Sequence, residues 1–174
     1  DVTIVALGAI PTMLPLALHT WETFSNHWHV DVKATFYVLR TLLSLPSRAG
    51  RRVLVVSSGA ALAGASPLSG GYTACKQAQR FLVKYANAEA KSRGVELAVQ
   101  CILPQLTPST RLGQVAVRAY YGEDALDLEA YARTRGSVLT PAVAGTAIVE
   151  LLRQPHDGVA ELVLDGGGLR PIPA

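Results

Sequence analysis

Few residues of the kinds that build metal centres or disulfide frameworks occur in this sequence. Its 174 residues include two cysteines, Cys75 and Cys101, and neither stands at a ligand spacing from a histidine or another cysteine. A disulfide framework is excluded, Cys75 is predicted to be a packing residue, and we expect a reducing, cytoplasmic compartment. His27 and His29 are two residues apart, so on a helix they point in different directions. No third ligand follows them at a fitting spacing, and we predict no metal site.

Long apolar runs and blocks of like charge are also missing. No stretch reaches the roughly 20 apolar residues that a membrane-spanning helix needs, so we predict no membrane association. The formal net charge is only +3 and is not clustered, so we predict no nucleic-acid surface. Hydrophobic residues make up 49% and charged residues 17%, which is the composition of a globular domain. No signal-peptide pattern is present, and the lack of an initiator methionine predicts that further residues precede Asp1.

The sequence does contain an alternation of apolar, strand-like runs with helical segments. Strands are predicted at residues 1–7, 51–57, 95–103 and 160–164, and helices at 21–45, 72–93, 114–120, 125–134 and 141–153. Thr20 is a predicted N-cap, Gly94 a predicted helix stop, and Thr140-Pro141 a predicted cap and first helical residue. The tail after Arg170 is expected to be extended. The alternation predicts one α/β domain over residues 1–174, with a doubly wound, mainly parallel sheet and helices on both faces.

In such a sheet, ligands bind beyond the carboxyl ends of the strands. Tyr72 and Lys76 lie four residues apart at the start of a predicted helix at that edge, so both side chains point to one side. A free phenol titrates near pH 10, and a neighbouring ammonium and a helix N-terminus both favour its ionised form. Ser58 follows the preceding strand and places a hydroxyl beside them. These three residues predict a site that transfers a proton to or from a carbonyl–carbinol oxygen.

The stretch VLVVSSGAALAG at residues 53–64, followed by Tyr72-Thr-Ala-Cys-Lys76, resembles the central strand, catalytic serine loop and active-site helix of the short-chain dehydrogenase/reductase family. Three further stretches resemble family segments in the same order: VDVKATF at 30–36, VQCILP at 99–104 and LVLDGG at 162–167. The resemblance covers nearly the whole chain. It implies a three-layer Rossmann-like fold.

The resemblance also implies an activity, which is hydride transfer between NAD or NADP and a carbonyl or secondary alcohol. Tyr72 would be the general acid/base, Lys76 would lower its pKa and bind the nicotinamide ribose, Ser58 would hold the substrate oxygen, and Ala60 would also contact the substrate. Asp31 occupies the position of the family's fourth catalytic residue, an asparagine.

Contacts with the nicotinamide and the substrate follow from the same resemblance. The implied cofactor contacts beyond Tyr72 and Lys76 are Gly8, Ala9, Pro104, Leu106 and one hydroxyl among Thr107, Ser109 and Thr110. Residues of about 105–140 correspond to a substrate lid, in which Tyr120 and Tyr121, with Leu126 and Leu128, are predicted to line an apolar pocket.

Several positions depart from the family pattern. The Asn-Asn-Ala-Gly turn is here Ala6-Leu7-Gly8-Ala9, Asp31 replaces asparagine, and the Pro-Gly turn is Pro104-Gln105. The Gly-rich turn that opens the family's fold has no counterpart, which implies that about three βα units, on the order of 70–90 residues, are missing from this chain. The incomplete sheet would then expose one face and the edge of its first strand.

Two other functions stay open at this stage. The departures favour a binding or structural protein with little catalysis, and the same scaffold also suits an epimerase or a dehydratase. The predicted partners are a small carbonyl or alcohol substrate and further copies of the chain. Small residues on the helix at 72–93 favour close helix packing, so we predict a homodimer or homotetramer.

Overall fold

The computed structural model describes residues 1–63, 66–122, 138–156 and 158–172. Its sheet has five strands in the order β1-β2-β3-β4-β5. They are β1 Val2–Val5, β2 Arg52–Val56, β3 Ala98–Pro104, β4 Glu161–Asp165 and β5 Gly168–Pro171. The first four run parallel, with Val53 opposite Val99, for example, and β5 is antiparallel to β4. The predicted parallel α/β fold is confirmed, whereas β5 extends the sheet where only an extended tail was predicted.

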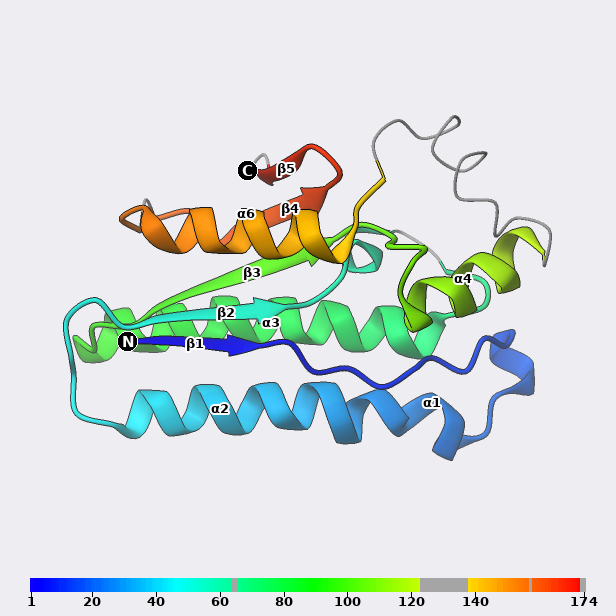
Figure 1. Cartoon of the computed structure of the whole chain (residues 1–174). Helices are drawn as coiled ribbons and strands as arrows, with labels where there is room; N and C mark the ends of the chain where they lie inside the picture. Colours follow the sequence, from blue (N-terminus) through cyan, green and yellow to red (C-terminus); the bar gives the residue numbers. More distant parts are fainter. Residues whose placement is uncertain (64–65, 123–137, 157, 173–174) are drawn as a thin grey trace.

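Helices cover both faces of the sheet (Figure 1). They are α1 Trp21–His27, α2 Lys33–Ser44, α3 Gly70–Arg93, α4 Arg111–Tyr121 and α6 Pro141–Arg153, with short 3-10 segments η1 Leu16–Leu18 and η3 Gly59–Leu62. One core cluster joins α2 and α3 to the sheet through residues such as Leu39, Val83 and Val55. A second cluster packs α6 against the opposite face around Leu54 and Ile102. No helix within the described ranges combines the length and apolar character needed to cross a bilayer.

The helix predicted over residues 21–45 is interrupted. A π-helical segment, η2 Trp28–Val32, lies between α1 and α2, and the Lys33 amide donates to the Trp28 carbonyl five residues earlier. The Thr20 cap is confirmed: its side chain accepts from the Thr23 amide, and the Thr23 hydroxyl accepts from the Thr20 amide in return. The π segment carries Asp31, and π turns of this kind are frequent at functional sites.

Helix α3 carries Tyr72 and Lys76 and begins at Gly70, two residues earlier than predicted. A Cβ on Gly71 would lie 2.8 Å from the Phe24 carbonyl oxygen, so glycine lets α3 approach α1 closely here. The helix ends as predicted at Gly94, whose φ is 63°. The predicted strand at 95–103 starts only at Ala98, because the Val95 amide still donates to the helical Ala90 carbonyl.

The remaining comparisons with the sequence concern α4, α6 and the edge strand β1. Helix α4 begins at Arg111 instead of 114 because Thr110 caps it, and the Thr140 cap of α6 is confirmed. The helix predicted at 125–134, with Leu126 and Leu128, lies outside the described residues. Strand β1 is at the edge of the sheet, and Val2 and Ile4 are 50% and 47% exposed, which agrees with the predicted open edge.

Candidate active site

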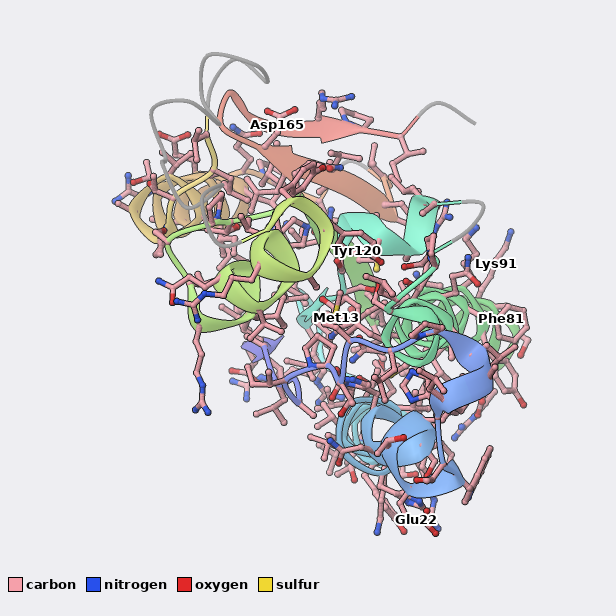
Figure 2. The ribbon with its side chains drawn as sticks, turned by 90° about the vertical axis from the view of Figure 1, so that its right-hand side faces the viewer. Met13, Glu22, Phe81, Lys91, Tyr120 and Asp165 are labelled. Carbon is pink, nitrogen blue, oxygen red and sulfur yellow. The ribbon has the colours of Figure 1, made fainter. Side chains whose placement is uncertain are left out.

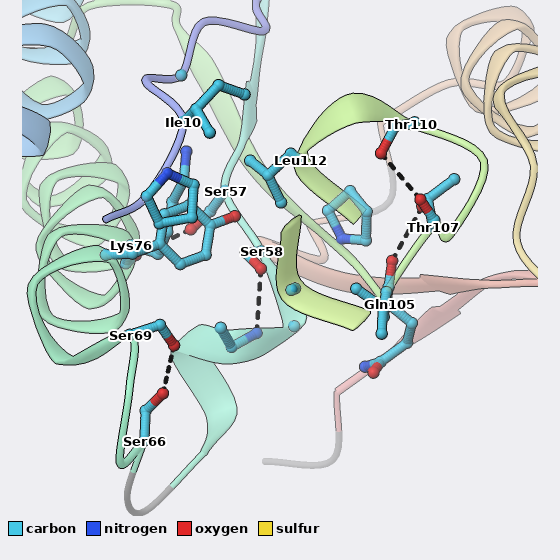
Figure 3. A pocket seen from close by; sticks show the side chains of 18 of the residues that line it. Ile10, Ser57, Ser58, Ser66, Ser69, Lys76, Gln105, Thr107, Thr110 and Leu112 are labelled. Carbon is cyan, nitrogen blue, oxygen red and sulfur yellow. Dashed lines mark hydrogen bonds between the residues drawn. The ribbon is translucent and has the colours of Figure 1, made fainter. Parts of the chain in front are cut away.

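A cavity of about 700 Å³ opens beyond the carboxyl ends of the parallel strands. Ten of the residues predicted from the sequence line it, namely Gly8, Ser58, Ala60, Tyr72, Lys76, Pro104, Leu106, Thr107, Tyr120 and Tyr121. Figure 3 shows Ser58 and Lys76 on one side of the cavity and the Gln105–Thr110 loop on the other. The fold thus brings together segments that are far apart in the sequence.

Tyr72 and Lys76 lie on the same side of α3. The Lys76 ammonium is 5.5 Å from the centre of the Tyr72 ring. Burial raises the pKa of Tyr72 above its ordinary value, while Lys76 and the Ser58 hydroxyl act in the opposite direction. The cost of burying a phenolate is the larger effect, so the pKa of Tyr72 lies above its ordinary value although Lys76 acts to lower it.

Asp31 forms a buried ion pair with Lys76. The Lys76 Nζ lies 2.9 Å from Asp31 Oδ2, and neither side chain is more than 4% exposed. The other carboxylate oxygen, Oδ1, accepts a 2.9 Å hydrogen bond from the Ala9 amide. Burial raises the pKa of Asp31, but His27, Lys76 and the Ala9 amide together hold that pKa below its ordinary value. Asp31 is therefore a buried carboxylate that pairs with Lys76 and does not itself line the cavity.

Ala9 has a different place from the one predicted. It is not among the residues that line the cavity, and its amide is committed to Asp31. Gly8 does line the cavity, and a Cβ there would lie 3.3 Å from Asp31 Oδ2 and 3.6 Å from Lys76 Nζ. The turn at residues 6–9 thus lies beside the Asp31–Lys76 ion pair, through Gly8 and the Ala9 amide.

Gln79 is a site residue that the sequence did not indicate. It is fully buried, and its Oε1 accepts a 2.9 Å hydrogen bond from Lys76 Nζ. Its Nε2 donates to the Asp31 carbonyl oxygen and to Thr35 Oγ1. Gln79 stands three residues after Lys76 on α3, so helical spacing was the available signal. Gln79 thus gives the ammonium a second partner besides Asp31.

His27, considered from the sequence only as a possible metal ligand, is a second site residue that was not predicted. The side chain is 2% exposed, and its ring meets the Tyr72 ring edge to face at 5.3 Å. Its Nδ1 lies 3.9 Å from Asp31 Oδ1. His27 and Asp31 are four residues apart, and that spacing could have linked them. Within the described residues no group of three His, Cys, Asp or Glu side chains could hold a metal ion.

Cys75 fills space beside this network. It is fully buried, and its Sγ donates to the His27 carbonyl oxygen. Burial raises the pKa of the thiol to about 12. A thiol that stays protonated at neutral pH is a poor nucleophile, so Cys75 has the packing role predicted for it.

The serines after β2 connect that strand to α3. Ser58 caps η3, and its Oγ accepts a 3.1 Å hydrogen bond from the Ala60 amide (Figure 3). Ser57, which the sequence analysis did not single out, donates to the Lys76 carbonyl oxygen at 2.8 Å. The strand end is thus tied to the helix turn that bears Lys76, while the Ser58 hydroxyl lies at the cavity.

The loop after β3 forms the opposite wall. Thr107 and Thr110 line the cavity, whereas Ser109 does not. Thr107 Oγ1 donates to the Gln105 carbonyl oxygen, and Thr110 is engaged in capping α4. The Gln105 amide lies over Gly59, where an added Cβ would be 2.7 Å from Gln105 Nε2. The bulky residue after Pro104 therefore fills space against the serine loop.

Tyr120 closes one end of the cavity from α4. Its Oη is 2.9 Å from Ser66 Oγ and 3.0 Å from Ser69 Oγ, and the two serine hydroxyls also contact each other. Burial raises the pKa of Tyr120, but the two serine hydroxyls outweigh it and bring that pKa below its ordinary value. Figure 2 shows Tyr120 beside the loop that precedes α3. Tyr120 thus lines the cavity, and its hydroxyl forms a cluster with those of Ser66 and Ser69.

Comparisons with known proteins give structural likenesses only. No family model matches the chain, and no curated protein matches it. An alcohol dehydrogenase from the archaeon Thermococcus sibiricus, solved with 5-hydroxy-NADP, is 24% identical with a TM-score of 0.69, over 99% of this chain and 65% of that one. The angucycline C-6 ketoreductase LanV with bound NADP is 25% identical with a TM-score of 0.56, over 76% and 55%.

A third likeness agrees with these two. A putative short-chain dehydrogenase from Escherichia coli CFT073, complexed with NADPH, is 22% identical with a TM-score of 0.59, over 87% of this chain and 55% of that one. The chain spans 55% to 65% of the length of these three solved proteins. At such low identities, the likeness establishes the architecture.

Proposed function

We propose that this chain, which has the fold of the short-chain dehydrogenases/reductases, functions as an NAD(P)-dependent oxidoreductase that interconverts a carbonyl group and a secondary alcohol. The observation that carries the proposal is the meeting of Tyr72, Lys76 and Ser58 at one cavity beyond the carboxyl ends of the strands. The NADP and NADPH complexes of structural neighbours support a nicotinamide cofactor. NAD and NADP are both retained as candidates.

The residues present fit such a cofactor. Gly8 leaves open the space beside Lys76 that a Cβ would fill, and Pro104, Leu106 and Thr107 form an apolar wall with one hydroxyl. When bound, a nicotinamide supplies or accepts the hydride. Lys76 and Thr107 are the residues that would hold it.

The chain's own residues would handle the proton. Tyr72 donates a proton to the developing alkoxide in reduction and removes one from the alcohol in oxidation. Ser58 holds the substrate oxygen beside the phenol, which stabilises the charge that develops there. Ala60, Tyr120 and Tyr121 bound the space left for the rest of the substrate.

The test is a titration of the full chain with NADH and NADPH, followed by fluorescence, with and without a panel of carbonyl compounds. We expect binding of one cofactor and its consumption in a one-to-one ratio with carbonyl reduced. Binding without turnover would favour the alternative of a cofactor-binding protein with little catalysis. That alternative has one observation in its favour, the engagement of Lys76 by both Asp31 and Gln79. Turnover without net cofactor consumption would instead indicate an epimerase or a dehydratase.

We also propose that the chain forms a homodimer or homotetramer through α2 and α3. Phe81 and Tyr85 on α3 are 66% and 60% exposed, and Figure 2 shows Phe81 pointing away from the molecule. Phe36 and Tyr37 on α2 are similarly exposed. Exposed apolar side chains gathered on two neighbouring helices are typical of protein–protein contacts.

Sedimentation measures this association directly. We expect a dimer or larger species at micromolar concentration, and at least about tenfold weaker association when Phe81 and Tyr85 are both changed to serine, because buried aromatic residues dominate interfaces. The matched control changes Val2 and Ile4, which are exposed on β1 instead, to serine. A monomeric wild-type chain, or equal weakening by both pairs, would contradict the proposal.

A further inference from the structure

The charge balance behind Tyr72 is the feature that distinguishes this site. A lone ammonium beside a phenol favours phenolate, because an opposite charge within about 4–6 Å stabilises the ionised form. Here the ammonium of Lys76 is already neutralised, since Asp31 Oδ2 lies 2.9 Å from it. The pair is buried, so solvent screens it little. The Asp31 carboxylate therefore offsets part of the effect that the ammonium has on the phenol.

The groups that face Tyr72 come from three elements. His27 approaches from α1, Asp31 from η2, and Cys75 and Lys76 from its own helix α3. The Cys75 thiol, with its pKa of about 12, is neutral near pH 7. Among the described residues, therefore, Asp31 and Lys76 are the charged groups that act on the phenol.

The ion pair is held in place by contacts that do not depend on the cavity. Asp31 accepts from the Ala9 amide at 2.9 Å. Lys76 donates to Gln79 Oε1, and Gln79 Nε2 returns to the Asp31 carbonyl oxygen. Both charged groups thus have a second partner, so the pairing is a fixed part of the site.

We propose that Asp31, by pairing with Lys76, offsets part of the ammonium's effect on Tyr72, favours the protonated phenol and so directs the site toward donating a proton to a carbonyl substrate. The inference rests on the proposed function and adds to it the favoured direction, which is reduction of a carbonyl compound. Asp31 acts as a positioning residue through Lys76 and has no contact with substrate. Burial and the Asp31 charge both raise the pKa of Tyr72, which agrees with this role.

The test is the ionisation of Tyr72 itself, followed by the ultraviolet difference absorbance of phenolate in the full chain. The chain has six tyrosines, so each curve is corrected by subtracting that of the same protein carrying Tyr72→Phe. Asp31→Asn restores the unbalanced ammonium. We expect it to lower the pH midpoint of Tyr72 ionisation by about one unit, a tenfold rise in phenolate at fixed pH. Asp31→Glu keeps the charge and should leave the midpoint within about half a unit of wild type.

A double variant tests the same inference even if Asp31→Asn folds poorly. Asp31→Asn with Lys76→Met removes both charges, so Tyr72 should ionise within about half a unit of wild type. Equal midpoints in wild type and Asp31→Asn would overturn the inference, and so would a double variant that ionises as early as Asp31→Asn alone.

A kinetic measurement then tests whether the charge of Asp31 affects the favoured direction of the reaction. The pH midpoint of alcohol oxidation should fall in Asp31→Asn by the same amount as the ionisation midpoint. An unchanged oxidation midpoint would overturn the proposed bias toward reduction. These outcomes are separate from those that test the proposed function, because the ionisation curve requires no turnover, and a chain without any turnover would still show whether Asp31 governs Tyr72.

Discussion

Changing Tyr72 to phenylalanine is expected to lower kcat/KM by about 10²- to 10⁴-fold, which is the usual contribution of a positioned general acid or base. The variant deletes one oxygen and keeps the ring, which packs edge to face against His27. The core contacts of α3 should therefore survive, with an unchanged circular dichroism spectrum and a similar melting temperature. Steady-state kinetics in both directions, with the better of the two cofactors, measures the loss.

Tyr85 provides the matched control for this change. It lies on the same helix α3 but is 60% exposed and outside the cavity. Tyr85→Phe deletes the same oxygen and should retain activity within about twofold, since a surface phenol away from the site has no part in proton transfer. Full activity in Tyr72→Phe would exclude Tyr72 as the acid or base. A loss of similar size in both variants would indicate a structural effect instead.

The parallel part of the fold could be read from the sequence because its signals are local. Four apolar, β-branched runs alternate with helical segments, and the structure has a parallel strand in each run. Strand β5 has no such signal: it is four residues long, begins at Gly168 and ends at Pro171. Its place in the sheet comes from pairing with β4, which is a tertiary effect. The π segment between α1 and α2 likewise has no local signature.

The candidate site likewise has features that local sequence patterns predict and features that they do not. The spacing of Tyr72 and Lys76 places both on one side of α3, and the structure brings them to the cavity with Ser58. Helical spacing links Gln79 to Lys76 and His27 to Asp31, but their other contacts span 44 or more residues and have no local signal: His27 meets Tyr72, and Gln79 meets Thr35 and Asp31. The sign of the shift in the pKa of Tyr72 depends on how deeply the phenol is buried, and only the packed structure supplies that quantity.

Lys76 is expected to be as important for stability as for catalysis. Lys76→Met would leave the Asp31 carboxylate buried, fully shielded from solvent and without its cation. Breaking a buried ion pair by removing one partner typically costs about 3–5 kcal/mol. Chemical denaturation of the full chain should show a loss of this size at about pH 7. A loss of activity in Lys76→Met therefore does not by itself establish a catalytic role.

The pH dependence of this loss follows from the carboxylate. In the wild type the pKa of Asp31 is held below its ordinary value, so the pair contributes stability above the unfolded pKa of about 3.9 and loses it as pH falls through the folded pKa. Without Lys76, burial would raise the pKa of Asp31, and protonation would relieve the buried charge. The stability difference between Lys76→Met and wild type should therefore shrink as the pH is lowered from about 7 toward 4.

The double variant Asp31→Asn with Lys76→Met provides the control. It has no buried charge, and replacing both members of a buried pair is often neutral or stabilising. We expect it to recover most of the free energy of unfolding that Lys76→Met loses, a coupling of about 2 kcal/mol or more between the two sites. If the two losses simply add, the ion pair contributes nothing to the stability of the fold. Full recovery of stability without recovery of turnover would separate the two roles of Lys76: the charge is dispensable for folding once Asp31 is neutral, yet required beside Tyr72.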